Sequence, residues 1–277
     1  MGRVKAFFKS GQFVSLVWII GIVLAWEIAA FFIADVFHDK MMNSKLPFLH
    51  NILGTIIGNF ALLSKACATT LSRAIIGFAA GALIGFALAI FMSLFRTIER
   101  ISYPYLLLSQ MIPILGLAPV VISIVHKVQI GSVTIAASDI TRVIIAAYIT
   151  FFPVATNMLS GLKSVDADKR SLMFTYAARK PTVYVKLMLP FSVPFLFSGL
   201  RIAAPLAVTA SILVDSLGAA GGIGYNMTYS LYTGTYSIFW ASVLCSAAMG
   251  ILGYYAMVLL EQVFMPWKRA SSKKGGK

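Results

Sequence analysis

Three ionisable side chains in or beside long apolar runs are the residues of this sequence whose types could do chemistry. Glu27 interrupts the apolar run 13–34, Arg201 interrupts the run 191–213, and Asp215 follows that second run and precedes a glycine-rich loop. If such runs cross a membrane, a charge inside them is costly and marks a partner or a transport path. Glu27 and Arg201 could pair, or Arg201 could extend to the lipid headgroups. Asp215 could line or gate a path, or it could be a solvated loop acid.

Motifs for bond chemistry are missing from the sequence. It contains no G-x-x-x-x-G-K-[ST] phosphate loop and no H-E-x-x-H pattern, and its histidines are scattered. Cys67 and Cys245 are far apart in the sequence and lie in or near apolar segments, which predicts two small buried thiols rather than a disulfide. We therefore predict a non-catalytic chain that binds no metal and no cofactor of its own.

The composition indicates that lipid is the solvent for much of this chain. Of its 277 residues 59% are hydrophobic and 12% are charged, whereas a soluble domain is about half apolar and a quarter charged. A helix needs about 20 apolar residues to span a bilayer. The sequence predicts an all-α polytopic membrane protein of about six spans, at residues 13–34, 74–95, 104–125, 143–162, 191–213 and 238–260. Prolines at 104, 113 and 119 predict a kink in the third span.

Basic residues predict the direction of the spans. The net charge of +14 is concentrated before the first span, after the second, after the fourth and in the tail. Because cytoplasmic loops are enriched in Lys and Arg, these segments are predicted to be cytoplasmic. The predicted order is a cytoplasmic N-terminus (1–12), one transmembrane domain (13–265) and a basic cytoplasmic tail (266–277), in the bacterial cytoplasmic membrane with both termini inside.

Two features outside the charged residues predict how helices pack. Gly77, Gly81 and Gly85 recur at a spacing of four, which predicts close helix packing within the chain or, as the alternative, a dimer seam. The long outer segment 35–73 predicts a helix that lies along the outer interface or packs on its own bundle.

The segment 163–190 is the longest predicted cytoplasmic loop. Asp166 can cap a helix of roughly 167–179, Pro181 would stop that helix, and a second helix would run into the fifth span. Leu172, Met173, Phe174 and Tyr176 are too apolar for a purely solvated helix. They predict contact with a groove on a partner or, equally, with the chain's own bundle.

This segment resembles the cytoplasmic signature of binding-protein-dependent ABC importer permeases. That signature runs Glu-Ala-Ala, three residues, Gly, nine residues, an aliphatic residue, any residue and Leu-Pro. Leu187 and Leu189-Pro190 match its end, whereas Ser171 and Ala177 stand where Glu and Gly are usual. The stretches "MIPILGLAPVVIS", "FFPVATNMLSGLKSVD", "LPFSVPFLFSGLRIA" and "DSLGAAGGIGYNM" are similar to the family as well. They resemble most the importers of nitrate, sulfonates, taurine and thiamine precursors, with hydroxymethylpyrimidine or riboflavin permeases the nearest type.

The resemblance implies a type I ABC importer permease with partners. ATP and Mg would bind on a partner ATPase dimer, an extracytoplasmic binding protein would deliver a small solute, and a second permease copy would complete the path. No nucleic acid is implied. The residues expected to contact the ATPase are Asp168, Ser171, Leu172, Met173, Phe174, Thr175, Tyr176, Ala177, Arg179 and Lys180.

Polar or kinked positions in the third to fifth spans are the candidates for the translocation path between two permeases. These are Gln110, Met111, Pro113, Asn157, Ser160 and Thr209, with Asp215 at the outer end. Each could instead form a helix–helix hydrogen bond or a packing kink. The alternative function is a secondary transporter driven by an ion gradient, which would call for paired intramembrane acids and internal repeats. "HKVQIGSVTIAASDIT" is longer than the usual loop between spans three and four.

Overall fold

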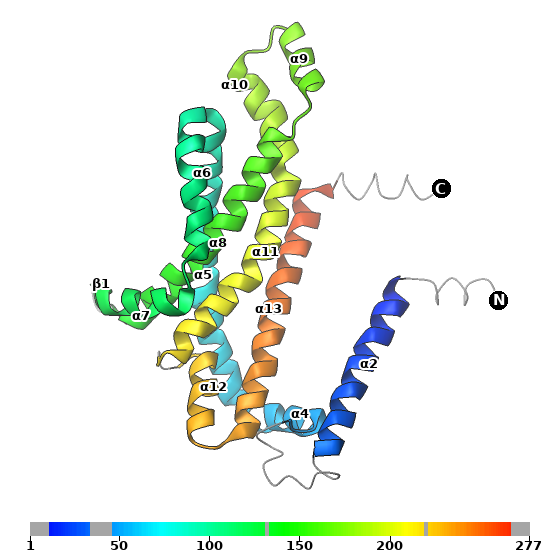
Figure 1. Ribbon diagram of the computed structural model, residues 1–277, viewed down its shortest axis with the longest axis vertical. Helices are drawn as coiled ribbons and strands as arrows, with labels where there is room; N and C mark the ends of the chain where they lie inside the picture. The colour runs from blue at the N-terminus through cyan, green and yellow to red at the C-terminus, as the bar shows by residue number, and fades with distance from the viewer. Residues whose placement is uncertain (1–10, 34–45, 131–132, 219–220, 267–277) are drawn as a thin grey trace, which may run out of the picture. The chain divides into compact units, whose positions relative to one another are not determined.

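The structure is a computed structural model that describes residues 11–33, 46–130, 133–218 and 221–266 (Figure 1). The predicted basic tail and most of the predicted cytoplasmic N-terminus lie outside these residues. The chain divides into two compact units, one formed by residues 1–64 and 226–244, and the other by 65–225 and 245–277.

The first unit contains α2 (Gly11–Phe31), α4 (Leu49–Gly58), the start of α5 (Phe60–Leu94), most of α12 (Ile223–Tyr232) and the start of α13 (Tyr236–Phe264). The rings of Trp26 and Trp240 meet edge to face at 5.4 Å, and the Trp26 indole donates a hydrogen bond of 3.0 Å to the carbonyl of Pro47. Helix α4 confirms the helix predicted in the segment 35–73; its place at the membrane interface stays a prediction.

The second unit is built around α8 (Ala137–Lys163) and α11 (Leu189–Ser216), which lie side by side in Figure 1. It also holds α6 (Arg96–Met111), α7 (Ile114–Ile124), α9 (Ala167–Thr175), α10 (Lys180–Val183), the π-helix η2 (Tyr184–Met188) and the rest of α5 and α13. The strands β1 (Val128–Ile130) and β2 (Val133–Ile135) form an antiparallel hairpin with Gln129 opposite Thr134. This hairpin accounts for the long loop before α8.

Two buried apolar clusters share α8. One joins α8 to α7 and α11 through residues such as Ala118, Ile145 and Val214, and the other joins α8 to α5 and α6 through Met92, Leu106 and Met158 among others. Small residues dominate the first cluster, so that the helix backbones approach closely, as is usual where lipid replaces water outside.

The glycine seam of α5 packs against α8, which confirms packing within the chain. A Cβ added at Gly77 would lie 2.6 Å from the carbonyl oxygen of Val143, and one added at Gly81 would lie 2.9 Å from the Cα of Ala147. Real Cβ atoms do not approach other atoms so closely, so α8 occupies the space that any larger side chain would need.

The long helices agree with a polytopic membrane protein. Among the described residues, α5, α8, α13 and the continuous helix Lys180–Ser216 are each long and apolar enough to cross a membrane. The pair α6 and α7 is bent by 99° and makes a fifth if it counts as one broken span. The break falls next to Pro113, the middle of the three prolines predicted to kink this span. The first predicted span coincides with α2, whose part Val17–Phe31 is a shorter apolar helix.

Candidate functional site

Helix α9 and the turn after it form the candidate site for contact with an ATPase. The Asp166 carboxylate accepts a hydrogen bond of 3.0 Å from the backbone N–H of Asp168, so the predicted cap is confirmed. The helix ends at Thr175, not near residue 179. The reason is Ala177, whose φ of 56° is left-handed and whose N–H bonds the carbonyl of Phe174 at 2.9 Å.

The prediction that Pro181 stops this helix is wrong. Pro181 lies in the first turn of α10, where its missing N–H costs nothing, and Arg179 precedes that helix as its N-cap residue. The predicted second helix is confirmed, because α10, η2 and α11 run on as one helix from Lys180 to Ser216.

No residue of α9 is buried. Leu172 is 57% exposed and Tyr176 is 80% exposed, so both side chains are accessible for a contact outside this chain. On the side of α9 that faces the bundle, Met173 is half-buried and the Arg170 guanidinium donates to the carbonyls of Lys163 and Val165 at 3.3 and 3.0 Å. The other residues predicted to contact the ATPase are exposed: Asp168, Ser171, Phe174, Thr175, Ala177, Arg179 and Lys180.

At the opposite end of α11, Asp215 is the centre of a buried polar network. Its carboxylate pairs with the Arg142 guanidinium and accepts a hydrogen bond of 2.5 Å from the Thr70 hydroxyl. Arg142 also pairs with Asp139, which in turn accepts two hydrogen bonds of 3.1 Å from Arg73. The network therefore ties α5 to the start of α8 and the end of α11.

Residues 222–224 of the glycine-rich segment pack against this network. The Thr70 hydroxyl accepts a hydrogen bond of 2.9 Å from the backbone N–H of Ile223. A Cβ added at Gly222 would overlap the carboxylate of Asp215, and one added at Gly224 would overlap the end of α11. Glycine is required at these two positions, because the Asp215 carboxylate and the end of α11 already occupy the space that a Cβ would need.

The alternative that Asp215 is a solvated loop acid is wrong, because its side chain is 0% exposed and that of Arg142 is 1% exposed. A buried carboxylate needs such a partner. The partners of Asp215 were not predicted: neither Arg142 nor Asp139 is among the candidate residues from the sequence. Asp139 and Arg142 are three residues apart on α8, and this spacing of an acid and a base on one helix face was the available signal for an ion pair.

The two other intramembrane charges have partners that differ from the predicted pair. Arg201 forms an ion pair with Glu261 of α13, a residue just past the end of the sixth predicted span. Glu27 accepts a hydrogen bond of 3.0 Å from the backbone N–H of Leu49 and lies 3.5 Å from His50 Nδ1. The predicted pair of Glu27 with Arg201 is therefore replaced by two separate contacts, in which each side chain has a different partner.

Most of the residues predicted for the translocation path are on the surface. Gln110, Met111 and Pro113 flank the break between α6 and α7 and are exposed. The Ser160 and Thr209 side chains are exposed on α8 and α11, and Asn157 is half-buried one turn from Ser160. These three donate hydrogen bonds of 2.8 to 3.1 Å to carbonyls of their own helices. Asp215 is the exception, because its side chain is buried in the network and does not lie on a surface.

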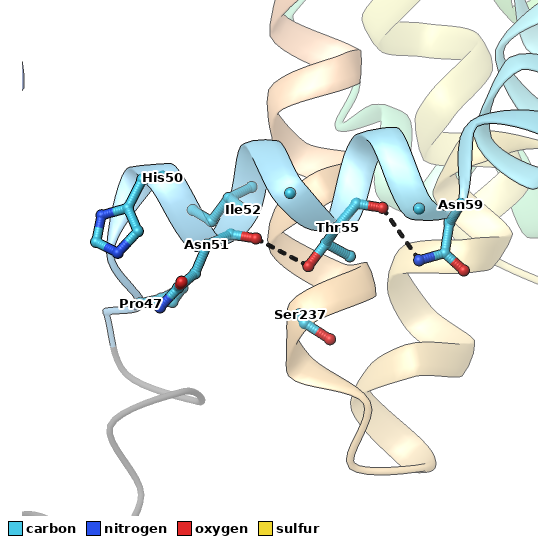
Figure 2. A pocket seen from close by; sticks show the side chains of 9 residues that line it. Pro47, His50, Asn51, Ile52, Thr55, Asn59 and Ser237 are labelled. Atoms are coloured by element: carbon cyan, nitrogen blue, oxygen red, sulfur yellow. Dashed lines mark hydrogen bonds between the residues drawn. The ribbon is translucent and has the colours of Figure 1, made fainter.

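Two further features lie outside the predicted sites. A pocket of about 430 Å³ runs along α4, where Asn51, Thr55 and Asn59 line it from one side and Ser237 from the other (Figure 2).

The thiols of Cys67 and Cys245, which are far apart in the sequence, interact with each other across α5 and α13. Among the described residues no cluster of His, Cys, Asp and Glu could hold a metal ion.

Comparisons with known proteins identify the family. Residues 77–264 match the family described as binding-protein-dependent transport system inner membrane component. The formylaminopyrimidine transport permease protein ThiX of Halalkalibacterium halodurans is 29% identical over 90% of this chain and 93% of its own length. The riboflavin transport system permease protein RibX of Chloroflexus aurantiacus is 27% identical over 62% of this chain and 61% of its own length.

Two more comparisons agree. The putative aliphatic sulfonates transport permease protein SsuC of Bacillus subtilis is 24% identical over 72% of this chain and 68% of its own length. A crystal structure of an amino acid ABC transporter with histidines shares the fold, with a TM-score of 0.57 at 15% identity over 76% of this chain and 95% of that chain. The protein belongs to the binding-protein-dependent transport system inner membrane components, the permease subunits of ABC importers, and is a non-catalytic, multi-pass membrane protein of that family.

Proposed function

We propose that this permease carries an uncharged pyrimidine-type thiamine precursor, which a binding protein delivers, across the bacterial cytoplasmic membrane. The observation that carries the choice of substrate is the match to the formylaminopyrimidine permease, which covers nearly the whole of both chains. Riboflavin and small sulfonate or nitrate-like anions are the other candidates, since the riboflavin and sulfonate permeases match over shorter parts.

The chemistry of the candidate path supports an uncharged solute. Gln110, Asn157, Ser160 and Thr209 offer amide and hydroxyl groups, which recognise a heterocycle by hydrogen bonds. A sulfonate or nitrate would call for a cation in the path. The arginines within the candidate spans α5, α8 and α11, which are Arg73, Arg142 and Arg201, each pair with a carboxylate.

Helix α9 is proposed to dock on the partner ATPase dimer. Its exposed Leu172 and Tyr176 would enter an apolar cleft, and Arg179 would meet polar groups at the rim. In this orientation the segments before α2 and after α13 are cytoplasmic, and the network around Asp215 lies on the side of the binding protein. A homodimer of permeases would enclose the path.

Copurification tests the docking surface. The permease, expressed with its ATPase, is purified in detergent, and bound ATPase is quantified. Tyr176→Asp combined with Leu172→Asp should remove the ATPase, because each places a charge in an apolar contact. Tyr176→Phe keeps the ring and should keep the complex. Retention of the ATPase by the double variant would exclude α9 as the docking surface.

Transport by the reconstituted complex tests the substrate. Uptake of labelled formylaminopyrimidine should require ATP and the binding protein and should exceed uptake of riboflavin and taurine. Preferred uptake of taurine would contradict the argument from uncharged path residues. Uptake without ATP that a proton or sodium ionophore abolishes would indicate the secondary transporter instead.

A further inference from the structure

A pocket lies where α9, α10, η2 and the end of α5 meet, and it shares Phe174 and Lys180 with the residues predicted to contact the ATPase but none with the path candidates. Its volume is about 470 Å³. Most of its lining is apolar, with Leu94, Phe174, Val185 and Met188 among the lining residues, and two cations, Arg170 and Lys180, also line it. The pocket therefore combines a wall suited to a hydrocarbon chain with a positively charged part.

The cations of this pocket face no carboxylate within its lining. Arg170 donates from Nη2 to two neutral backbone carbonyls, while its Nε is buried and has no hydrogen-bond partner among the described residues. Of the acids nearest in sequence, Asp166 caps α9 with its carboxylate and Asp168 is exposed, while Glu99 pairs with Lys163. A buried guanidinium nitrogen without a partner is costly, and an anion would satisfy it.

The position of the pocket points to lipid. Ser93 and Leu94 are at the end of the candidate span α5, and Tyr184 and Val185 are near the start of the candidate span Lys180–Ser216. The Ser93 and Tyr184 hydroxyls bond each other at 2.5 Å and so hold these two ends together. The predicted apolar run 74–95 ends beside Leu94, which places this side of the pocket at the level of the lipid headgroups, whichever side of the membrane this is.

We propose that this pocket binds an anionic phospholipid. The phosphate lies between Arg170 and Lys180, and one acyl chain follows the apolar wall formed by Leu94, Val185 and Met188. Because Arg170 and Phe174 belong to α9, the lipid joins the helix proposed to contact the ATPase to the ends of two spans. Basic pockets between membrane helices are known to bind acidic headgroups.

Lipid retention tests this proposal on the full-length protein. The purified protein is exchanged into detergent with phosphatidylglycerol or phosphatidylcholine, and bound lipid is counted by native mass spectrometry. The expected result is retention of phosphatidylglycerol, reduced roughly fivefold for each cation removed by Arg170→Gln and Lys180→Gln. Lys186→Gln is the matched control: it is an exposed cation of η2 that does not line the pocket, and it should retain the lipid.

Arg170→Lys separates binding from folding, because it keeps the charge and should keep most of the lipid even if the Gln variant is poorly folded. Equal retention of phosphatidylcholine would overturn the proposal, since it would show an apolar crevice without charge selection. Complete displacement of phosphatidylglycerol by millimolar inorganic phosphate would also overturn it, because the acyl chain would then contribute nothing. Loss of lipid in Lys186→Gln to the same extent as in the pocket variants would place the lipid elsewhere.

Discussion

Neutralising Asp215 tests whether the buried network holds α5, α8 and α11 together. Asp215→Asn keeps the shape of the side chain and removes the charge that faces Arg142. Breaking a buried ion pair costs about 3–5 kcal/mol, because the remaining charge is left in a medium of low polarity. Arg142 still contacts Asp139 in the variant, so we expect the lower end, a loss of about 3 kcal/mol in the free energy of unfolding.

A double variant shows whether this loss belongs to the pair. Replacing both partners by apolar residues, Arg142→Met with Asp215→Leu, removes the two buried charges together and should cost less than the sum of the single changes. Asp139 stays neutralised in that variant by its two hydrogen bonds from Arg73. The coupling energy of residues in one network is about 0.5–3 kcal/mol, and we expect the upper half of this range.

The assay is unfolding of the detergent-solubilised protein by titration with sodium dodecyl sulfate, followed by tryptophan fluorescence. Glu99→Gln is the matched control, because it makes the same chemical change in the pair with Lys163, whose side chain is 50% exposed. Exposed pairs contribute about 0–1 kcal/mol. If Asp215→Asn is as mild as Glu99→Gln, or if the double variant is additive, the network does not stabilise the fold as argued.

Three more predictions concern packing, backbone and thiols. Gly81→Ala should destabilise the protein by about 1–3 kcal/mol in the same titration, because α8 leaves no room for a Cβ. Gly250→Ala is the control and should be neutral or stabilising, because its Cβ would meet its nearest neighbour only at 4.0 Å. Ala177→Gly should lower amide hydrogen exchange in α9, because glycine adopts the left-handed conformation about 1–2 kcal/mol more easily; faster exchange would contradict this. Oxidation with copper phenanthroline should join Cys67 to Cys245 and so make both thiols unreactive toward maleimide until reductant is added. In Cys67→Ala, Cys245 should stay reactive after the same treatment. If both thiols of the original chain still react after oxidation, they do not meet.

Features with a local physical cause were predictable from the sequence. A carboxylate at position 166 caps the following helix, a proline at 113 breaks the third span, and glycines four residues apart form a close seam, and the structure contains all three. Each depends on neighbours along the chain or on a single helix face. The family could be recognised for a similar reason, because its signature is a run of local positions.

The end of α9 shows where a local reading fails. Pro181 and the basic residues after 178 suggested a helix to residue 179, yet the chain turns at Ala177. Alanine is a strong helix former and gives no sign of a left-handed turn. The relevant signal was the alignment with the family signature, in which a glycine stands at this position. In physical terms, the surrounding fold imposes on Ala177 a conformation that glycine would adopt without strain.

The ion pairs were missed because helices extend beyond their apolar runs. The sixth predicted span ended at 260, but α13 continues to Phe264, so Glu261 is part of the helix and reaches Arg201. Likewise α8 begins at Ala137, before the predicted span at 143, so Arg142 points into the bundle where Asp215 needs a cation. A bilayer sets the length of the apolar run, but backbone hydrogen bonds continue the helix past it. The partner of a charge inside a span should therefore be sought first among the charges in the flanking turn of a neighbouring helix, because a charge outside the apolar run costs less free energy. Another charge at the same depth in the membrane is the second choice.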